Sequence, residues 1–421
     1  DLQSCIDYAK EQNITIRKNR ITAASTQIDV KTAKAALFPS LSFSTSQQVV
    51  NRPYQETSSR VSGSEIISSN SKTSYNGNYG LNASWTLYNG NKRLKTIQQE
   101  KLNNQVAELD VATSENNIQE SIAQVYIQIL YAAESVKVNE STLQVSIAQR
   151  DRGQELLNAG SIAKSDFAQL EAQVSTDRYQ LVTAQATLED YKLQLKQLLE
   201  LDGENEMNIY LPALSDENVL APLPTKKDVY IRALSLRPEI EASKLNVEAS
   251  ELGIGIAKSS YLPTISLSAG IGTNHTSGSD FTFGEQVKNG WNNSIGLSVS
   301  VPIFNNRQTK SAVQKAKLQY ETSMLSLLDE QKTLYKTIEG LWLDANSAQQ
   351  RYAAANEKLK STQISYELIS EQFNLGMKNT IELLTEKNNL LQAQQEQLQA
   401  KYMAILNMQL LKFYQGDQLA I

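Results

Sequence analysis

The sequence predicts an α+β fold that is built twice along the chain. An internal repeat, four uncharged segments with alternating polarity and two long stretches without proline indicate this fold. The Ala-Lys pair that precedes Pro39 returns before Pro263, and the Asn-x-Gly triplet that ends at Gly160 returns at Gly376. Long repeats usually reflect a quasi-symmetric architecture, so we expect an internal two-fold repeat.

The composition limits the classes of protein that fit. The 421 residues are 40% hydrophobic and 7% aromatic, which is modest for a packed enzyme of this size. Mean hydropathy is −0.40, and no run of about 18 apolar residues could form a transmembrane helix. The sequence begins at Asp1 without a basic n-region or an apolar h-region, so we expect either a cytosolic protein or one whose signal peptide has been removed. The net charge of −5, with scattered Lys and Arg, argues against a nucleic-acid partner.

Few residues could support catalysis or bind a metal or cofactor. Cys5 is the only cysteine and His275 the only histidine, which excludes an intrachain disulfide and a Cys/His metal cluster. We interpret Cys5 as a small apolar residue and His275 as a loop residue. Gly253 and Gly255 begin a dinucleotide-type pattern, but Lys258 occupies its third glycine position. We therefore expect no enzyme, no metal and no cofactor.

Four segments, at about 40–50, 74–88, 264–274 and 291–303, contain no Asp, Glu, Lys or Arg, although 20% of the chain is charged. They alternate in polarity, which predicts β-strands. In the second segment, one face carries Tyr75, Tyr79, Leu81, Ala83, Trp85 and Leu87. These lengths suit strands that cross a bilayer, with apolar side chains facing outward. Aromatic residues near the segment ends fit a membrane interface, namely Tyr75, Trp85, Tyr88 and Trp291. The edge of a soluble β-sandwich is the alternative.

Four strands cannot close a membrane barrel, because the smallest closed barrels use about eight. An open edge in lipid would leave backbone N–H and C=O groups unpaired at several kcal/mol each. The chain must therefore oligomerise if it spans a membrane. Three copies would supply twelve strands and two copies eight, and this argument permits both.

The rest of the chain predicts long helices. Residues 91–158 and 306–374 lack proline, and each stretch would form a helix of about 90 to 100 Å if continuous. The arm after Gly160 has apolar residues at alternating spacings of three and four, which predicts a coiled-coil seam with one polar interruption at Asp177. The arm after Gly376 keeps this period with a more polar seam.

These patterns divide the chain into four parts. We expect a first repeat at 1–201 with a helical hairpin that turns near 160, and a second repeat at 231–415 that turns near 376. Residues 202–230, which include three prolines, predict an equatorial linker with little regular structure, and 416–421 form a tail. Pro302 is tolerable only where the fourth strand ends.

The chain resembles the TolC-type outer-membrane efflux proteins over nearly its whole length. The resemblance rests on the Ala-Lys-x4-Pro entries to strands one and three, the run from Gly296 to Phe304, and the Asn-x-Gly turns at Gly160 and Gly376. It implies a membrane α+β protein: a trimeric twelve-stranded β-barrel, four strands per chain, continuous with a long helical coiled-coil barrel. It also implies an outer-membrane location in a Gram-negative bacterium, with the helices in the periplasm.

The resemblance also implies a gate and an acidic throat beside the helical turns. In this sequence the corresponding residues are Ser165, Asp166, Phe373, Lys378, Glu382 and Thr385. Phe373 replaces the family's tyrosine and Thr385 its second acid, so the resemblance implies a weaker gate and a single acidic ring. Without it, Lys378 and Glu382 would be an ordinary i,i+4 surface pair.

The function implied by the resemblance is a passive exit duct for tripartite efflux or type I secretion. Its partners would be two further copies of the chain, outer-membrane lipid, a periplasmic adaptor that contacts the turns at Gly160 and Gly376, and an inner-membrane pump. The pump could be proton-driven or of the ABC type, and the cargo stays open. A soluble coiled-coil scaffold or adaptor is the alternative, but it leaves the uncharged segments unexplained.

Overall fold

The computed structural model describes residues 1–54, 58–62, 65–69, 72–202, 209–210, 212, 219–279 and 281–419. The chain divides into two compact units. The helical unit comprises Asp1–Ala23, Ala107–Ser243 and Ser326–Ile421, and the sheet unit comprises Ala24–Val106 and Lys244–Leu325. Each unit therefore contains segments from both halves of the sequence.

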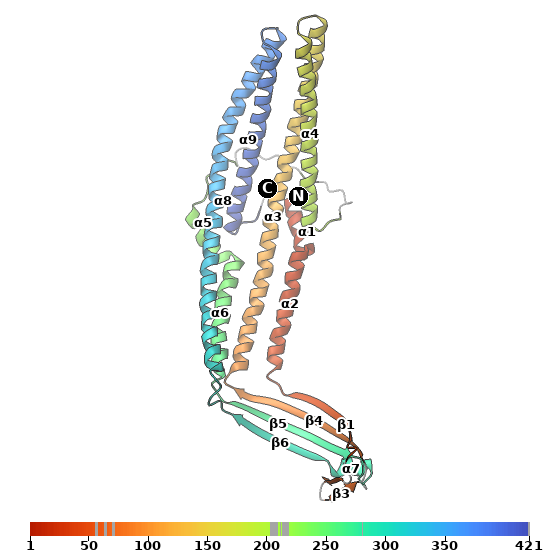
Figure 1. The fold of residues 1–421 in the computed structure, drawn as a ribbon. Helices are drawn as coiled ribbons and strands as arrows, with labels where there is room; N and C mark the ends of the chain where they lie inside the picture. The colour runs from red at the N-terminus through yellow and green to blue at the C-terminus, as the bar shows by residue number, and fades with distance from the viewer. Residues whose placement is uncertain are drawn as a thin grey trace. The chain divides into compact units, whose positions relative to one another are not determined.

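Four long helices form two hairpins of equal length (Figure 1). In the first hairpin, α3 (Lys92–Asn158) has 67 residues and α4 (Lys164–Leu198) has 35. In the second hairpin, α8 (Gln308–Asn374) has 67 residues and α9 (Thr380–Tyr414) has 35. The absence of proline from their interiors allows these helices to continue without a kink.

The shorter helices are α1 (Leu2–Gln12), α2 (Ile14–Ala35), α5 (Lys226–Leu236) and α6 (Pro238–Ser259). Helix α5 begins inside the segment that was predicted to be a linker with little regular structure. The Thr225 hydroxyl accepts a hydrogen bond from the backbone N–H of Asp228 at 3.3 Å, so Thr225 caps the helix. The Thr-x-x-Asp spacing was the sequence signal for this helix.

Part of the predicted linker lies against α8. The indole N–H of Trp342 donates to the Pro224 carbonyl at 3.0 Å, and the Gln349 amide donates to the Val219 and Ala221 carbonyls. The backbone of this segment is thus hydrogen-bonded without regular secondary structure. Residues 203–208, 211 and 213–218 of the linker, and 420–421 of the tail, lie outside the described residues.

The core of the helical unit lies where α1 and α5 meet the long helices. Its fully buried side chains include Ile6 of α1, Tyr126 of α3 and Ile338 of α8. The Tyr126 hydroxyl donates to the Tyr210 carbonyl at 2.6 Å, which satisfies its only polar atom. Burial is concentrated here because elsewhere the narrow apolar seams of the helices bury few side chains.

The sheet unit contains a four-stranded antiparallel sheet with strand order β1-β4-β5-β6. The strands are β1 (Ser40–Asn51), β4 (Thr73–Asn89), β5 (Thr264–Thr276) and β6 (Asn292–Ser300). Pro39 and Pro263 immediately precede β1 and β5, where a missing backbone N–H costs least. The four predicted strands therefore form one sheet, as Figure 1 shows.

The strand register gathers the apolar side chains on one face. Phe43 of β1 is opposite Leu81 of β4, which is opposite Ile271 of β5. Leu267 lies between Trp85 and Leu297. Cross-strand partners share a face, so these residues form a continuous apolar surface. The opposite face carries Ser, Asn, Gln, Thr and Gly almost throughout.

A β-bulge corrects one part of the predicted pattern. The alternation assigned Leu87 to the face of Trp85, but the register shifts between Thr86 and Tyr88. Trp85 is opposite Leu267 and Tyr88 is opposite Ile265, so Tyr88 joins the apolar face and Leu87 has no opposite residue in β5. An extra residue in one strand reverses the alternation beyond it, which a strict period of two cannot predict.

The connections and ends of the strands also differ from the prediction. Strand β6 ends at Ser300, before Pro302, whereas the predicted segment continued to Ile303. The connection between β1 and β4 contains a short hairpin of β2 (Ser58–Ser62) and β3 (Glu65–Ser69), and α7 (Phe283–Asn289) precedes β6. His275 is in β5 rather than in a loop. Its ring stacks on the ring of Tyr79 in β4, at a centroid distance of 5.9 Å.

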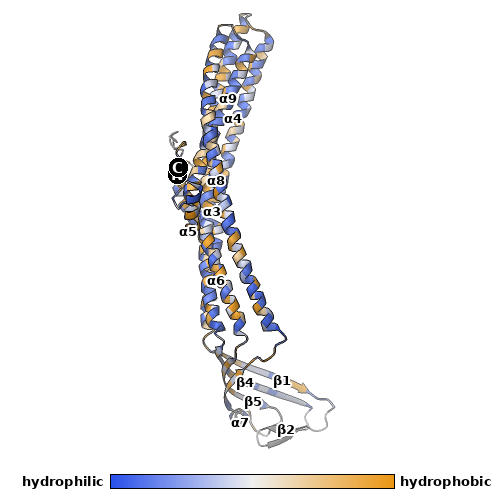
Figure 2. Cartoon of the chain, turned by 90° about the vertical axis from the view of Figure 1, so that its left-hand side faces the viewer, coloured by the Kyte–Doolittle hydropathy of each residue, from blue (hydrophilic) through white to orange (hydrophobic). Residues whose placement is uncertain are grey.

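The helices carry mixed polarity along their length (Figure 2). Among the described residues, none of the helices has the length and apolar character that crossing a membrane requires.

The core predicts a graded response to truncation of Ile338, which is almost completely buried. We expect Ile338→Val to lower the free energy of unfolding by about 0.5–1.5 kcal/mol and Ile338→Ala by about 2–5 kcal/mol, because each removes buried apolar atoms and leaves a cavity. Denaturant unfolding in detergent, followed by the helical circular dichroism signal, measures both. Equal stability of the two variants would contradict this packing.

Candidate functional site

The two helical turns have the same backbone conformation. Gly160 and Gly376 have φ of +74° and +72°, in the left-handed region that only glycine adopts readily. The backbone N–H of Ser161 donates to Leu156, and that of Met377 donates to Gln372, at 2.8 Å in each case. These are the hydrogen bonds of Schellman motifs, which satisfy carbonyl groups at the ends of α3 and α8.

After the second turn, Lys378, which precedes α9, contacts Glu382 in the first turn of α9. The Lys378 ammonium donates to the Glu382 carboxylate at 2.5 Å, and the Asn379 backbone N–H donates to the same carboxylate at 3.1 Å. The hydrogen bond from Lys378 and that from Asn379 lower the pKa of Glu382 below its usual value. The carboxylate therefore stays charged and caps the start of α9.

The other predicted gate residues contact their own helices. The Asp166 carboxylate accepts from the backbone N–H of Ala163 at 3.3 Å, at the start of α4, and Ser165 is exposed beside it. The Thr385 hydroxyl donates to the Ile381 carbonyl at 2.7 Å within α9. Phe373 is buried at the end of α8. Of the six predicted residues, the structure thus brings together Lys378 and Glu382.

A polar cluster that the sequence did not predict joins the two hairpins. Lys387 of α9 donates to the carboxylate of Asp177 in α4 and to the hydroxyl of Ser146 in α3, and Ser146 donates to Asp177. Lys387 is 3% exposed and Asp177 1%. Desolvation lowers the pKa of Lys387, and the neighbouring Asp177 carboxylate acts in the opposite direction. Asp177 was the polar interruption of the predicted seam, and this contact explains it.

The four predicted interface aromatics lie in β4 and immediately before β6. Tyr75, Trp85 and Tyr88 are exposed residues of β4, and Trp291 is exposed immediately before β6. The Trp85 indole N–H donates to the Leu37 carbonyl at 2.7 Å, which orients the ring at the end of the strand. Each ring is thus exposed in the single chain.

The sequence identifies the family of this chain. Residues 5–200 and 229–416 match the family described as outer membrane efflux protein. The chain belongs to the outer membrane efflux protein family. This confirms the predicted TolC-type family and the predicted location in the outer membrane of a Gram-negative bacterium.

Named relatives of this chain are distant in sequence. The chain is 24% identical over 290 residues to outer membrane efflux protein BepC of Brucella suis. This match covers 68% of this chain and 60% of BepC. The chain is 23% identical over 311 residues to outer membrane protein TolC of Escherichia coli. This match covers 72% of this chain and 62% of TolC. Alkaline protease secretion protein AprF of Pseudomonas aeruginosa is 21% identical over 297 residues, 70% of this chain and 60% of AprF.

Solved structures show the same fold. CusC, whose structures concern folding and transmembrane channel formation, aligns with a TM-score of 0.84 and 18% identity over 99% of this chain and 92% of CusC. The outer membrane channel CmeC of Campylobacter jejuni aligns with a TM-score of 0.80 and 18% identity over 100% of this chain and 87% of CmeC.

Replacing glycine with alanine should have opposite effects on stability at the helical turns and inside a helix. An added Cβ would meet nothing within 4 Å at Gly160, Gly376 or Gly340, and Gly340 lies inside α8. Gly160→Ala and Gly376→Ala should each destabilise the protein by about 1–2 kcal/mol through backbone strain. The control, Gly340→Ala, should stabilise it by about 0.5–1 kcal/mol. Thermal unfolding midpoints that shift in the same direction at Gly160 and Gly340 would rule out this account.

Proposed function

We propose that this chain is one protomer of a homotrimeric outer-membrane channel-tunnel, the passive exit duct of a tripartite efflux or type I secretion system. Three four-stranded sheets would pair edge to edge into a twelve-stranded barrel, which the coiled-coil helices continue as a tunnel. Family membership favours this function over the soluble scaffold. The duct itself performs no chemistry.

The observation that carries this proposal is the asymmetry of the sheet. One face is a continuous apolar surface and the other is hydroxyl- and amide-rich, and within the described residues β1 and β6 are the two edge strands of the sheet. Nearly all residues of these two edge strands are exposed. A barrel closed by neighbouring copies pairs the edges, turns the apolar face to lipid and leaves a polar face around water.

The periplasmic end would control access to the tunnel. Lys378 and Asp166 lie at the starts of α9 and α4, beside the two helical turns, together with Ser165, Phe373 and Thr385. Glu382 would form a single acidic ring, with one carboxylate from each protomer. A periplasmic adaptor would contact the turns at Gly160 and Gly376 and connect the duct to a proton-driven or ABC-type pump in the inner membrane.

Reconstitution of the purified protein tests the proposed function. In a planar lipid bilayer it should form discrete conducting channels, and in detergent its mass should correspond to three chains. A protein that is extracted without detergent and never conducts would support the scaffold instead. Growth of a deletion strain on a panel of antimicrobial compounds then defines the cargo.

Two adjacent residues of β6 distinguish the faces of the sheet. Leu297 is on the apolar face and Ser298 on the polar face. Leu297→Arg should cost about 2–4 kcal/mol near the bilayer midplane and prevent assembly, because the charge would face lipid. The matched control, Ser298→Arg, should still assemble. Trimer content of outer-membrane fractions measures both, and equal assembly would contradict the assigned faces.

Replacement of the gate residues should increase leakage. The double variant Lys378→Ala, Asp166→Ala removes both charged side chains from the periplasmic end, so single-channel conductance and uptake of large antibiotics should rise. The control is Lys358→Ala, which removes an exposed lysine of α8 that lies away from the turn. Unchanged conductance in the double variant would remove Lys378 and Asp166 from the proposed gate.

A further inference from the structure

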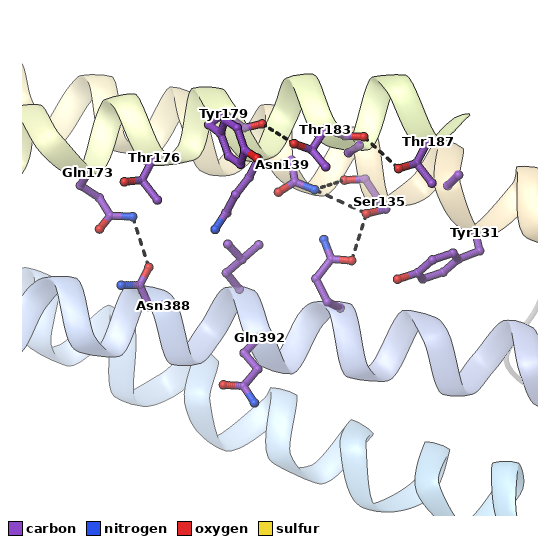
Figure 3. A pocket seen from close by; sticks show the side chains of 15 residues that line it. Tyr131, Ser135, Asn139, Gln173, Thr176, Tyr179, Thr183, Thr187, Asn388 and Gln392 are labelled. Carbon is purple, nitrogen blue, oxygen red and sulfur yellow. Dashed lines mark hydrogen bonds between the residues drawn. The ribbon is translucent and has the colours of Figure 1, made fainter. Parts of the chain in front are cut away.

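The charges of the chain are unevenly distributed along its helices. The whole chain has 40 Lys and Arg against 45 Asp and Glu. A cavity of about 640 Å³ between α3, α4 and α9 is lined by uncharged side chains only, and at one end of it Gln173 donates to Asn388 at 3.3 Å (Figure 3). The helical residues next to the sheet are instead strongly basic.

Four helices join the sheet at the same end, where α2 and α6 lead into β1 and β5 and where α3 and α8 follow β4 and β6 (Figure 1). The first acidic residues beyond the sheet on α2, α3, α6 and α8 are Asp29, Glu100, Glu251 and Glu321. The segments between these residues and the strands contain ten Lys or Arg and no Asp or Glu, and they are 30–39, 90–99, 252–263 and 301–320. This end of the helices is thus positive, although the chain carries a net charge of −5.

Eight of these ten basic side chains are exposed and make up a basic band. They are Lys31, Lys34, Lys92, Lys258, Arg307, Lys310, Lys315 and Lys317. The other two are engaged, because Arg93 donates to the Thr86 carbonyl at 2.5 Å and Lys95 to the Gly255 carbonyl at 3.3 Å. Within the described part of the chain, no member of the basic band forms an ion pair. The protomer itself therefore does not neutralise these charges.

Helix stability accounts for only part of the basic band. Lys34 and Lys258 lie in the last turns of α2 and α6, where a cation interacts favourably with the helix dipole. Lys92 and Lys310 lie in the first turns of α3 and α8, neither of which has an acidic residue there. A cation at that end opposes the dipole and lowers the stability of the helix. This placement favours an anionic partner from outside the chain.

Exposed aromatic side chains separate the basic band from the sheet. Phe38 precedes β1, Tyr261 precedes β5 and Phe304 follows β6, with exposed fractions of 73%, 52% and 81%. Trp85 lies near the corresponding end of β4. With increasing distance from the sheet, the exposed side chains thus change from apolar to aromatic and then to cationic. Hydrocarbon, interface and phosphate follow one another in the same order through half a bilayer.

The internal repeat gives two members of the basic band the same local geometry. Lys34 and Lys258 are the lysines of the Ala-Lys pairs that precede Pro39 and Pro263. The Lys34 carbonyl accepts from the backbone N–H of Leu37 at 3.1 Å, and the Lys258 carbonyl accepts from that of Tyr261 at 3.0 Å. Equivalent turns therefore place a lysine beside the aromatic residues in both halves of the chain.

We propose that the basic band binds the anionic headgroups of phospholipids in the periplasmic leaflet of the outer membrane. This inference rests on the proposed channel function, which puts the sheet in the membrane and the helices in the periplasm. Lys317, the member farthest along α8, is nine residues beyond Gln308, about 14 Å along the helix axis. The headgroup layer is about 5–8 Å thick and the Debye length is about 8 Å, so the whole band lies within reach of the phosphate charge. The bound lipids would fix the depth of the barrel in the membrane.

Lipid preference of the purified protein in detergent tests this inference. Fluorescent phosphatidylglycerol and phosphatidylcholine with identical acyl chains are titrated separately. We expect the wild type to bind phosphatidylglycerol about tenfold more tightly or better. This preference should shrink severalfold when NaCl is raised from about 0.1 to 0.5 M, because salt screens the attraction. Equal binding of the two lipids by a wild type that forms channels would overturn the inference and leave the proposed function standing.

A band variant tests the residues. It combines Lys34→Gln, Lys258→Gln, Arg307→Gln and Lys310→Gln. Each basic residue near an anionic surface strengthens binding about fivefold, so the preference for phosphatidylglycerol should fall about fivefold or more, with binding of phosphatidylcholine unchanged. A second variant that exchanges lysine and arginine at the same four positions keeps the charges and should keep the preference. The wild-type measurement remains decisive even if the band variant fails to fold.

The matched control removes three lysines and one arginine that are exposed in the helical unit. It combines Arg178→Gln, Lys332→Gln, Lys336→Gln and Lys360→Gln, and it should bind both lipids as the wild type does. An equal loss of preference in the control would show a general effect of net charge and would contradict the inference.

Two further measurements distinguish other partners of the basic band. A band variant that keeps its lipid preference but no longer sediments with purified peptidoglycan would assign these charges to the cell wall. One that keeps its lipid preference but shifts the ion selectivity of the channel would place them in the tunnel. Either result would overturn the inference. A wild type that never conducts and is extracted without detergent would overturn the proposed function itself.

Discussion

The unpaired backbone groups at the two edges of the sheet are the constraint on which the rest of the architecture depends. Strands β1 and β6 each have one strand neighbour among the described residues. Water can satisfy the outer N–H and C=O groups of such strands, but hydrocarbon cannot. A sheet with a continuous apolar face thus needs copies of itself before it can enter lipid. In the proposed trimer, oligomerisation is a condition of membrane insertion rather than a later step.

The sequence predicted the strands well because their physical signal is strong. Polar and apolar residues alternate, charges are missing, and Pro39 and Pro263 mark where β1 and β5 begin. It did not predict the bulge between Thr86 and Tyr88, which brings Tyr88 onto the apolar face against a strict alternation. The short elements β2, β3 and α7 were missed because they are too short for a clear periodicity.

The contacts of the candidate site also differ in whether the sequence could predict them. Contacts between residues close in sequence, such as Lys378 with Glu382, follow from sequence spacing and could be predicted. The contact between Asp177 and Lys387 joins residues 210 positions apart, so it depends on how the hairpins pack. Only the position of Asp177 in an otherwise apolar seam indicated a buried partner. Removing one member of such a pair typically costs about 3–5 kcal/mol, far more than breaking an exposed pair.

The equal lengths of the hairpins have a consequence for how this protein can evolve. Helices α3 and α8 each contain 67 residues, and α4 and α9 each contain 35. An insertion or deletion in one hairpin would shift its tip relative to the tip of the other hairpin. It would also displace every contact between the two hairpins that lies beyond the change. We therefore expect length variation among homologues to be compensated, so that whole helical turns are gained or lost in both hairpins together.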